Sequence, residues 1–194
     1  LPRGSVEKRE RNLPHWRRDG STYFVTWRLG AGSLSATERD IVLDACLHWH
    51  GKRALVDVAC VMPNHVHMLL TPLPSLDGGW HSLSSIVKSI KQFSATTINR
   101  SLGTSGTLWQ DEFHDRIVRD EAEFKELWNY VWANPVSAKL AGEFDEYKWT
   151  KCPGETHRLE ACATALFKSR GTFEGRIGLT TEVPRGAHGF GYDP

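Results

Sequence analysis

Apolar positions along the chain alternate between a two-residue spacing and a helical spacing, and these changes outline the predicted elements. Runs rich in alternating, β-branched or aromatic residues predict strands at residues 23–29, 54–61, 65–70 and 113–118. Apolar residues three or four positions apart predict helices at residues 35–51, 82–100 and 120–135. Ser35 with Glu38, and Asp120 with Glu123, have the spacing of a helix-capping box. The elements therefore follow the order strand, helix, strand, strand, helix, strand, helix.

This order predicts the fold class. The short segment Met62-Pro63-Asn64 between the second and third strands indicates an antiparallel hairpin. Pro135 is expected to end or kink the third helix, with one further short turn of helix over residues 135–141. We therefore expect an α+β protein with a ferredoxin-like (RRM-like) antiparallel sheet, helices packed on one face, and a C-terminal extension.

The chain divides into three predicted segments. Residues 1–20 form a basic N-terminal arm, of which residues 1–5 resemble a protease-site remnant and are excluded from the fold. Residues 21–142 form the main domain. In the extension, residues 143–194, the signals weaken: residues 161–168 have a helical pattern, and the glycines and prolines of residues 171–194 predict a flexible tail.

Composition excludes several classes of protein. The chain is 40% hydrophobic and 24% charged, which is typical of a folded globular domain rather than a disordered one. No apolar run is long enough for a membrane span, and no signal-peptide pattern is present, so a soluble cytoplasmic protein is expected. The four cysteines form no CxxC pair, which argues against a zinc ribbon or a disulfide framework; they are Cys46, Cys60, Cys152 and Cys162.

Charge is uneven along the chain, although its sum is only +1. Residues 7–18 carry five basic residues and an aromatic. Residues 82–110 carry three basic residues, no acidic residue and many serines and threonines, whose hydroxyls can donate to phosphates. Residues 120–148 hold seven acidic and three basic residues. The average therefore conceals segments suited to a nucleic-acid partner.

Two histidines stand two positions apart in the predicted third strand. Side chains alternate between the faces of a strand, so His65 and His67 are expected to project from one face while Val66 and Met68 point into the core. Neutral imidazoles bind divalent metals, and an oxygen ligand from elsewhere would complete a site with positions open for substrate. The alternative is a pair of ordinary strand histidines.

A second candidate pair lies on the predicted third helix. Tyr130 and Asn134 are four residues apart and therefore share one helix face, flanking the apolar stripe. A phenol beside an amide oxygen suits a metal-assisted tyrosine nucleophile. The alternatives are a tyrosine that simply packs and an asparagine that precedes a proline at a helix end.

Together these motifs resemble the REP-associated tyrosine transposases, relatives of the single-strand insertion-sequence transposases of the HUH (His-hydrophobic-His) superfamily. The resemblance runs through Arg11-Asn12-Leu13-Pro14-His15-Trp16, the first strand, Pro63-Asn64-His65-Val66-His67, residues 108–116 and residues 130–140. The motifs PNHVH and YxxxNPVxA are jointly specific in this order, and the similarity extends over about residues 9–150.

The resemblance implies an HUH catalytic domain over residues 21–142 that cleaves and rejoins single-stranded DNA carrying REP-like hairpins. In that family a tyrosine attacks phosphorus, which gives a 5′-phosphotyrosine and a free 3′-OH; here this role falls to Tyr130. His65, His67 and Asn134 would hold Mg²⁺ or Mn²⁺. Trp132 stands where relatives often carry a histidine, which puts the rate and mode of cleavage in question.

The resemblance also implies that the basic arm reads a short tetranucleotide beside the hairpin. The candidate DNA contacts are the basic and aromatic residues of the arm and the basic residues of the second helix: Arg9, Arg11, Trp16, Arg17, Arg18, Lys88, Lys91 and Arg100. Each has an alternative, which is a solvated charge or, for the tryptophan, core packing. Association with the nucleoid follows from this partner, and both a monomer and a homodimer are compatible with the sequence.

Three rival functions remain open at this point. A domesticated DNA-binding protein could keep the fold and hairpin recognition without cleavage. An RNA-binding module could share the topology, but the aromatic glycine-rich strand motif of RRM modules is missing. A metal phosphodiesterase could use the histidines and leave Tyr130 idle.

Overall fold

The computed structural model describes residues 7–9, 15–143 and 146–153 of the 194-residue chain. For residues 7–9 and 15–17 it describes the backbone, and side chains are described from Arg18 onward. None of the helices in these ranges is long and apolar enough to cross a membrane. The predicted helix at residues 161–168 and the predicted tail at residues 171–194 lie outside the described residues.

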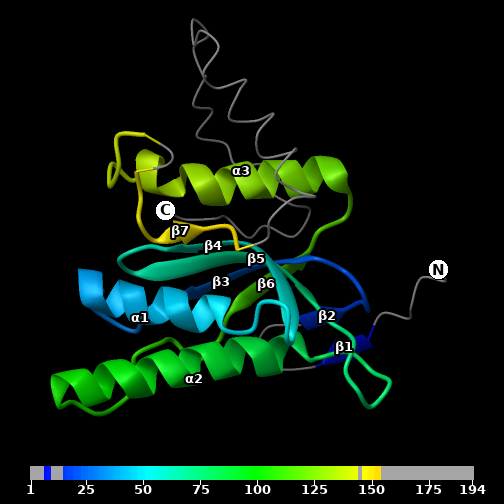
Figure 1. Ribbon diagram of the computed structural model, residues 1–194, viewed down its shortest axis with the longest axis horizontal. Helices are drawn as coiled ribbons and strands as arrows, with labels where there is room; N and C mark the ends of the chain where they lie inside the picture. The colour runs from blue at the N-terminus through cyan, green and yellow to red at the C-terminus, as the bar shows by residue number, and fades with distance from the viewer. Residues whose placement is uncertain (1–6, 10–14, 144–145, 154–194) are drawn as a thin grey trace, which may run out of the picture. The chain divides into compact units, whose positions relative to one another are not determined.

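A five-stranded antiparallel sheet forms the centre of the described domain (Figure 1). Its strands lie in the order β6 (His114–Ile117), β3 (Tyr23–Arg28), β5 (His65–Pro72), β4 (Ala54–Val61) and β7 (Thr150–Lys151). β4 and β5 form the predicted hairpin, and β5 is central because β3 pairs with its other edge. The predicted α+β class and antiparallel sheet are confirmed.

Helices α1 (Ala36–Leu47) and α2 (Leu83–Leu102) cover one face of this sheet. α1 begins with the predicted capping box, in which Ser35 and Glu38 bond to each other's backbone N–H. The core between these helices and the sheet includes the buried side chains of Trp27, Val66, Met68, Ile86 and Ile90. This face supplies most of the apolar burial of the domain, which is the main stabilising contribution to such a fold.

Helix α3 (Glu121–Ser137) lies across the opposite face of the sheet, so the expectation that all helices pack on one face is wrong in this detail (Figure 1). It buries Phe124, Leu127 and Val131, as the helical spacing predicts. Cys60 and Leu69 are buried although they point away from α1 and α2, because α3 covers them. Continuous apolar runs in β4 and β5, rather than strict alternation, are the sequence signal of a sheet covered on both faces.

Pro135 lies inside α3 and does not end it. The helix continues to Ser137, and the N–H of Ala138 donates to the carbonyl of Asn134. A proline removes one helical hydrogen bond, but this loss falls in the last turn, where few bonds follow. As a result Asn134 stays helical and keeps its place one turn beyond Tyr130.

The sheet also includes residues that the sequence assigns to the C-terminal extension. β7 pairs with β4 through Cys60 and Thr150. The Tyr147 hydroxyl donates to the carbonyl of Val61 (2.9 Å), and the Trp149 indole donates to Asp40 on α1 (2.8 Å). The folded body therefore reaches beyond the predicted boundary at residue 142.

Part of the basic arm forms a small antiparallel ladder of its own. β1 (Glu7–Arg9) pairs with β2 (His15–Arg17), so that Glu7 lies opposite Arg17 and Arg9 lies opposite His15. The sequence predicts a basic arm here, and its predicted strands begin only at residue 23. Strands this short carry too little alternation to be recognised from sequence alone.

Candidate active site at strand β5 and helix α3

His65 and His67 lie side by side at the start of β5. Their ring centroids are 4.6 Å apart. In the sheet register His65 pairs with Arg28 and His67 pairs with Thr26, both on β3. The strand alternation that predicts a shared face for the two imidazoles is therefore realised, and the face is the one covered by α3.

The orientation of His67 is set by a neighbour on β3. Its Nδ1 lies 2.7 Å from the Oγ1 of Thr26, and its ring stacks on Phe24 at 5.5 Å between centroids. The side chain is buried at 4% exposure, and its Nε2 has no hydrogen-bond partner among the described residues. A buried polar atom without a partner is costly, so this nitrogen is poised to bind something that the chain itself does not supply.

His65 is oriented by the residue before it. Its Nδ1 lies 2.6 Å from the Oδ1 of Asn64. An amide oxygen only accepts hydrogen bonds, so Nδ1 carries the proton and the lone pair is on Nε2. The side chain of Asn134 also hydrogen-bonds to His65. Both histidines thus have Nδ1 engaged by a side-chain oxygen, which is the usual way of fixing a metal-binding imidazole.

Both imidazoles are held neutral. Burial, followed by the positive charge of Arg28, lowers the pKa of His65 to about 4, against the hydrogen bond from Asn134. Burial, followed by the charges of His65 and Arg28, lowers the pKa of His67 well below its ordinary value. Histidine binds metal only in its neutral form, so these shifts favour ligation near pH 7.

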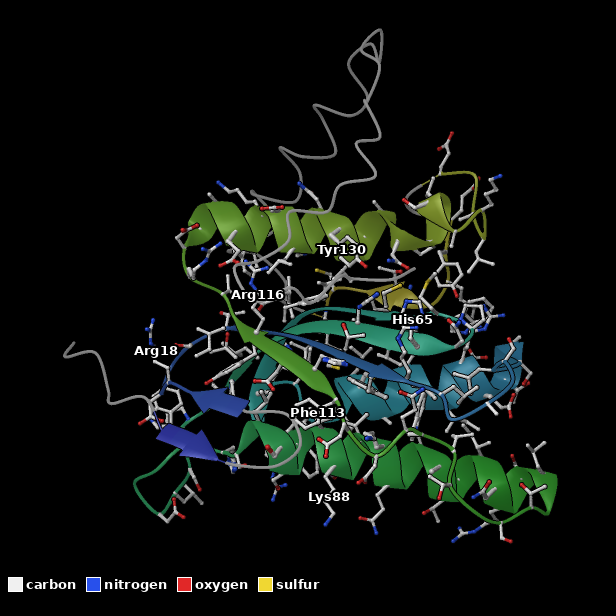
Figure 2. All side chains as sticks on the ribbon, turned by 180° about the vertical axis from the view of Figure 1, so that it is seen from behind. Arg18, His65, Lys88, Phe113, Arg116 and Tyr130 are labelled. Atoms are coloured by element: carbon white, nitrogen blue, oxygen red, sulfur yellow. The ribbon has the colours of Figure 1, made fainter. Side chains whose placement is uncertain are left out.

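Tyr130 projects from α3 toward the same pair of histidines (Figure 2). Its ring meets that of His67 edge-on at 5.3 Å between centroids and that of Phe24 at 5.9 Å. At 40% exposure it is accessible to a ligand. The flanking position predicted from helical spacing places the ring beside the imidazoles and leaves it exposed.

Three of these side chains, those of His65, His67 and Asn134, fit a divalent metal. The Nε2 atoms of the two histidines and the amide oxygen of Asn134 are neutral donors of the kind that such ions accept, and three ligands leave positions open for a substrate. The orphaned Nε2 of His67 is the structural observation behind this fit. The structure thus brings together all four residues that the sequence singles out from β5 and α3.

Sequence reasoning missed four residues of this site: Phe24, Thr26, Arg28 and Asn64. Asn64 was visible as part of the PNHVH motif, without a role. The other three stand at every second position of β3. The two-residue period of that strand could have predicted that they share one face. Their partners on β5 could not be named without the register between the two strands.

The predicted DNA contacts divide into four groups, and Lys91 forms one of its own. Arg11 lies outside the described residues, and the side chains of Arg9, Trp16 and Arg17 are not described. Arg18 lies near the β1–β2 ladder, far along the domain from His65 (Figure 2). Lys88 and Arg100 are exposed on α2, which lies on the sheet face opposite to the candidate site.

Lys91 has a different environment from the other basic residues of α2. Its Nζ donates to the carbonyls of Gln110 and Asp111, both at 2.7 Å. Burial lowers its pKa, against the attraction of Asp111 and Glu112. In this structure Lys91 therefore holds the segment before β6 and has little capacity left for a phosphate.

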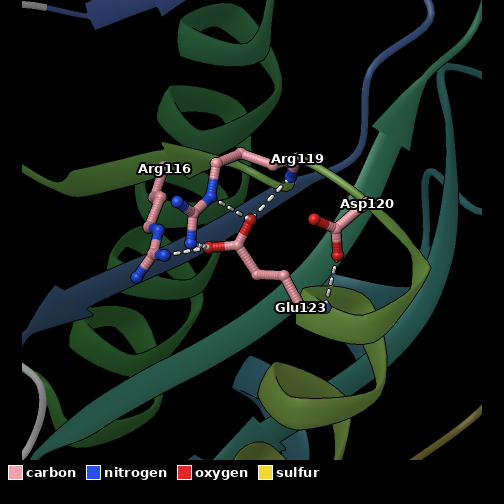
Figure 3. A network of polar contacts seen from close by, with 4 residues as sticks. All are labelled: Arg116, Arg119, Asp120 and Glu123. Carbon is pink, nitrogen blue, oxygen red and sulfur yellow. Dashed lines mark hydrogen bonds and ion pairs between the residues drawn. The ribbon is translucent and has the colours of Figure 1, made fainter.

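A buried carboxylate fixes α3 to the sheet at the helix N-terminus (Figure 3). Glu123 accepts from Arg116 on β6, and from both the backbone and the guanidinium of Arg119. Asp120 caps the helix by accepting from the Glu123 N–H at 2.9 Å. Glu123 and Tyr130 are two helical turns apart on similar faces, so this network sets how α3 presents the tyrosine.

Trp132, two residues after Tyr130, stacks in parallel on Trp128 with 5.1 Å between centroids. Trp128 is buried in the contact of α3 with the sheet. Trp132 thus extends an aromatic contact along α3, and the imidazole contact of Tyr130 is with His67.

Comparison with known proteins identifies the class. Residues 39–134, which hold all four site residues, match the family model described as "Transposase IS200 like". A Haemophilus influenzae protein, described provisionally as a REP-associated tyrosine transposase, is 24% identical over 142 residues, covering 64% of this chain and 77% of that protein. A second, uncharacterised protein of that organism is 25% identical over 99 residues, covering 42% of this chain and 54% of that protein.

The fold has a solved counterpart. A REP-associated tyrosine transposase bound to a REP hairpin superposes with a TM-score of 0.57 and 22% identity, covering 71% of this chain and 82% of that one. The family model matches 96 of the 194 residues, and over this region the chain is similar to the IS200-like transposases. Within that class, the resemblance to the REP-associated tyrosine transposases that the motifs indicate is confirmed.

Proposed function

We propose that this protein is a divalent-metal-dependent nuclease and strand transferase that acts on single-stranded DNA carrying REP-type hairpins. The observation that carries the proposal is the contact of the exposed Tyr130 with the neutral imidazole of His67, whose Nε2 is buried without a hydrogen-bond partner among the described residues. The similar transposase with a bound REP hairpin supports the choice of DNA as partner. The site and the partner thus belong to one reaction class, phosphoryl transfer.

In the proposed reaction the Tyr130 hydroxyl oxygen attacks the scissile phosphorus. A bond forms between Oη and phosphorus, and the bond from phosphorus to the 3′-oxygen breaks. The phenol loses its proton and the leaving 3′-oxygen gains one, so the products are a 5′-phosphotyrosine and a free 3′-OH. Attack by a 3′-OH on the phosphotyrosine reverses the step and joins strands, with no nucleotide cofactor required.

The protein's own residues prepare this step. Thr26 and Asn64 fix the orientation of the two imidazoles. The rings of Phe24 and His67 contact the Tyr130 ring edge-on. Mg²⁺ or Mn²⁺ held by His65, His67 and Asn134 would withdraw charge from the phosphate and orient the attack. A free tyrosine has a pKa near 10, so stabilising the phenolate is part of what the site must do.

A covalent-adduct assay tests the proposal. A labelled single-stranded hairpin oligonucleotide is incubated with protein and Mn²⁺, and the products are separated under denaturing conditions. Tyr130→Phe is expected to abolish the protein–DNA adduct while hairpin binding persists. Tyr23→Phe is the control, because Tyr23 is buried on the opposite face of the sheet; its hydroxyl bonds to the Arg18 backbone, so the control is run at saturating DNA, where the adduct should be unchanged.

The outcomes separate the rival functions. An undiminished adduct in Tyr130→Phe would remove the nucleophile assignment. A free 5′-phosphate without any adduct would favour a metal phosphodiesterase. Hairpin binding by the unaltered protein without cleavage would instead indicate a domesticated DNA-binding protein.

A further inference from the structure

Arg28 is the basic residue that the sheet places beside the candidate metal ligands. It is the last residue of β3 and pairs directly with His65. Directly paired side chains in antiparallel strands project from the same face, so Arg28 shares the face that carries His65 and His67. Its charge also contributes to the lowered pKa of both histidines, after the larger effect of burial.

The ligand set beside Arg28 carries no negative charge. Two imidazoles and one amide are all neutral, and within the described ranges no carboxylate contributes to the pKa shift of either histidine. In those ranges no three His, Cys, Asp or Glu side chains come together as a ready metal site either. A divalent ion bound here would keep its full charge and would be repelled by the guanidinium of Arg28.

An anion that lies between the two cations removes this repulsion. A phosphodiester has two non-bridging oxygens, one of which can face the ion while the other accepts from a guanidinium. In such an arrangement one phosphate group contacts both the ion and the guanidinium of Arg28, whose positive charge acts on both histidines. It also places a positive charge where negative charge accumulates as phosphorus gains a fifth oxygen.

We propose that Arg28 is a phosphate-binding catalytic residue that contacts a non-bridging oxygen of the scissile phosphate, and that it makes divalent-ion binding depend on bound DNA. The inference rests on the proposed function, since it names how the same site recognises its substrate. By thermodynamic linkage, DNA must tighten ion binding by the same factor by which the ion tightens DNA binding.

The test measures Mn²⁺ affinity in the Tyr130→Phe background, in which DNA binds without being cleaved. Titration calorimetry is carried out with and without a saturating single-stranded hairpin oligonucleotide. We expect the protein with Arg28 to bind Mn²⁺ at least about tenfold more tightly when DNA is present. Arg28→Gln should tighten Mn²⁺ binding to the free protein by about threefold or more and reduce the enhancement by DNA. Arg28→Lys should retain part of the enhancement.

A matched control separates a local effect from a change in total charge. Lys52 is exposed at the end of the sheet where β4 begins, and the seven-residue step from Pro72 back to His65 along β5 corresponds to about 23 Å. Lys52→Gln should therefore leave both Mn²⁺ affinities unchanged. Thermal unfolding of each variant verifies that the fold is intact.

Equal enhancement by DNA in Arg28→Gln and in the unaltered background would overturn the inference. So would the absence of Mn²⁺ binding even in the presence of DNA. A second measurement uses the chain with Tyr130 in place, where single-turnover adduct formation should slow in Arg28→Gln at saturating DNA and Mn²⁺. If no adduct forms but the enhancement of Mn²⁺ binding by DNA depends on Arg28, the proposed cleavage activity is wrong. The proposed contact between Arg28 and the phosphate is then still supported.

Discussion

Thr26 and His67 face each other across β3 and β5, with 2.7 Å between the threonine Oγ1 and the imidazole Nδ1. This contact leaves Nε2 of His67 as the nitrogen that points to the candidate metal position. The pair shows how the site is built: one strand carries the ligands, and its neighbour determines which nitrogen each ligand presents.

Thr26→Val removes this hydroxyl while nearly preserving the shape of the side chain. Partners of metal-bound histidines typically contribute ten- to a hundredfold to affinity, so we expect Mn²⁺ binding in the presence of DNA to weaken by about tenfold or more. Thr22→Val is a matched control, because it breaks a similar contact, to Thr71 at 2.8 Å, near the other end of β3. Equal weakening in both variants would contradict a specific role for Thr26.

Asn134→Asp converts a neutral candidate ligand into an anionic one. We expect Mn²⁺ to bind the free protein more tightly, by about tenfold, since a carboxylate adjacent to the ion adds an attraction that the amide lacks. Calorimetric titration without DNA measures this change. Asn129→Asp makes the same change at an exposed position on α3 and should have little effect. Unaltered affinity in Asn134→Asp would argue that Asn134 is no ligand.

Glu123→Gln tests the network that fixes α3. Removing the charge leaves Arg116 and Arg119 without their shared partner, and we expect a loss of about 1–3 kcal/mol in the free energy of unfolding near pH 7. Burial raises the pKa of Glu123, but the hydrogen bonds from Arg119 and the charge of Arg116 outweigh it, so the pKa in the folded state is lowered.

The sign of the pH dependence follows from this direction. A carboxyl group with a lowered pKa in the folded state stabilises the protein above its unfolded pKa of about 4.5, and this contribution is lost as pH falls through the lower folded value. The stability difference between the unaltered protein and Glu123→Gln should therefore shrink as pH falls below about 4.5. Urea denaturation at several pH values measures this stability difference. A difference that does not change with pH would contradict an ionised Glu123 in the folded protein.

Lys91 and Lys88 lie three residues apart on α2. We expect replacement of Lys91 to affect stability, and replacement of Lys88 to affect DNA binding. Lys91→Met loses two charged hydrogen bonds to backbone carbonyls, and we expect a destabilisation of about 1.5–3 kcal/mol with an unchanged salt dependence of DNA binding. Lys88→Met should leave stability within about 0.5 kcal/mol, because the side chain is exposed. If Lys88 contacts a phosphate, its loss lowers the slope of log affinity against log salt by about one. An unchanged slope would remove Lys88 from the predicted interface.

By itself, the sequence was sufficient to predict the α+β class, the antiparallel hairpin that carries His65 and His67, and the shared helix face of Tyr130 and Asn134. These features depend on local periodicity, since a strand alternates every two residues and a helix brings residues four apart together. The tertiary structure decided that α3 covers the sheet face opposite to α1 and α2, and that Pro135 lies within the helix. It also decided that Arg28 and Thr26 lie beside the histidines, and that Lys91 is engaged by backbone carbonyls. Each of these depends on which distant segments pair or pack, and sequence periodicity carries no information on the register between segments far apart in the chain.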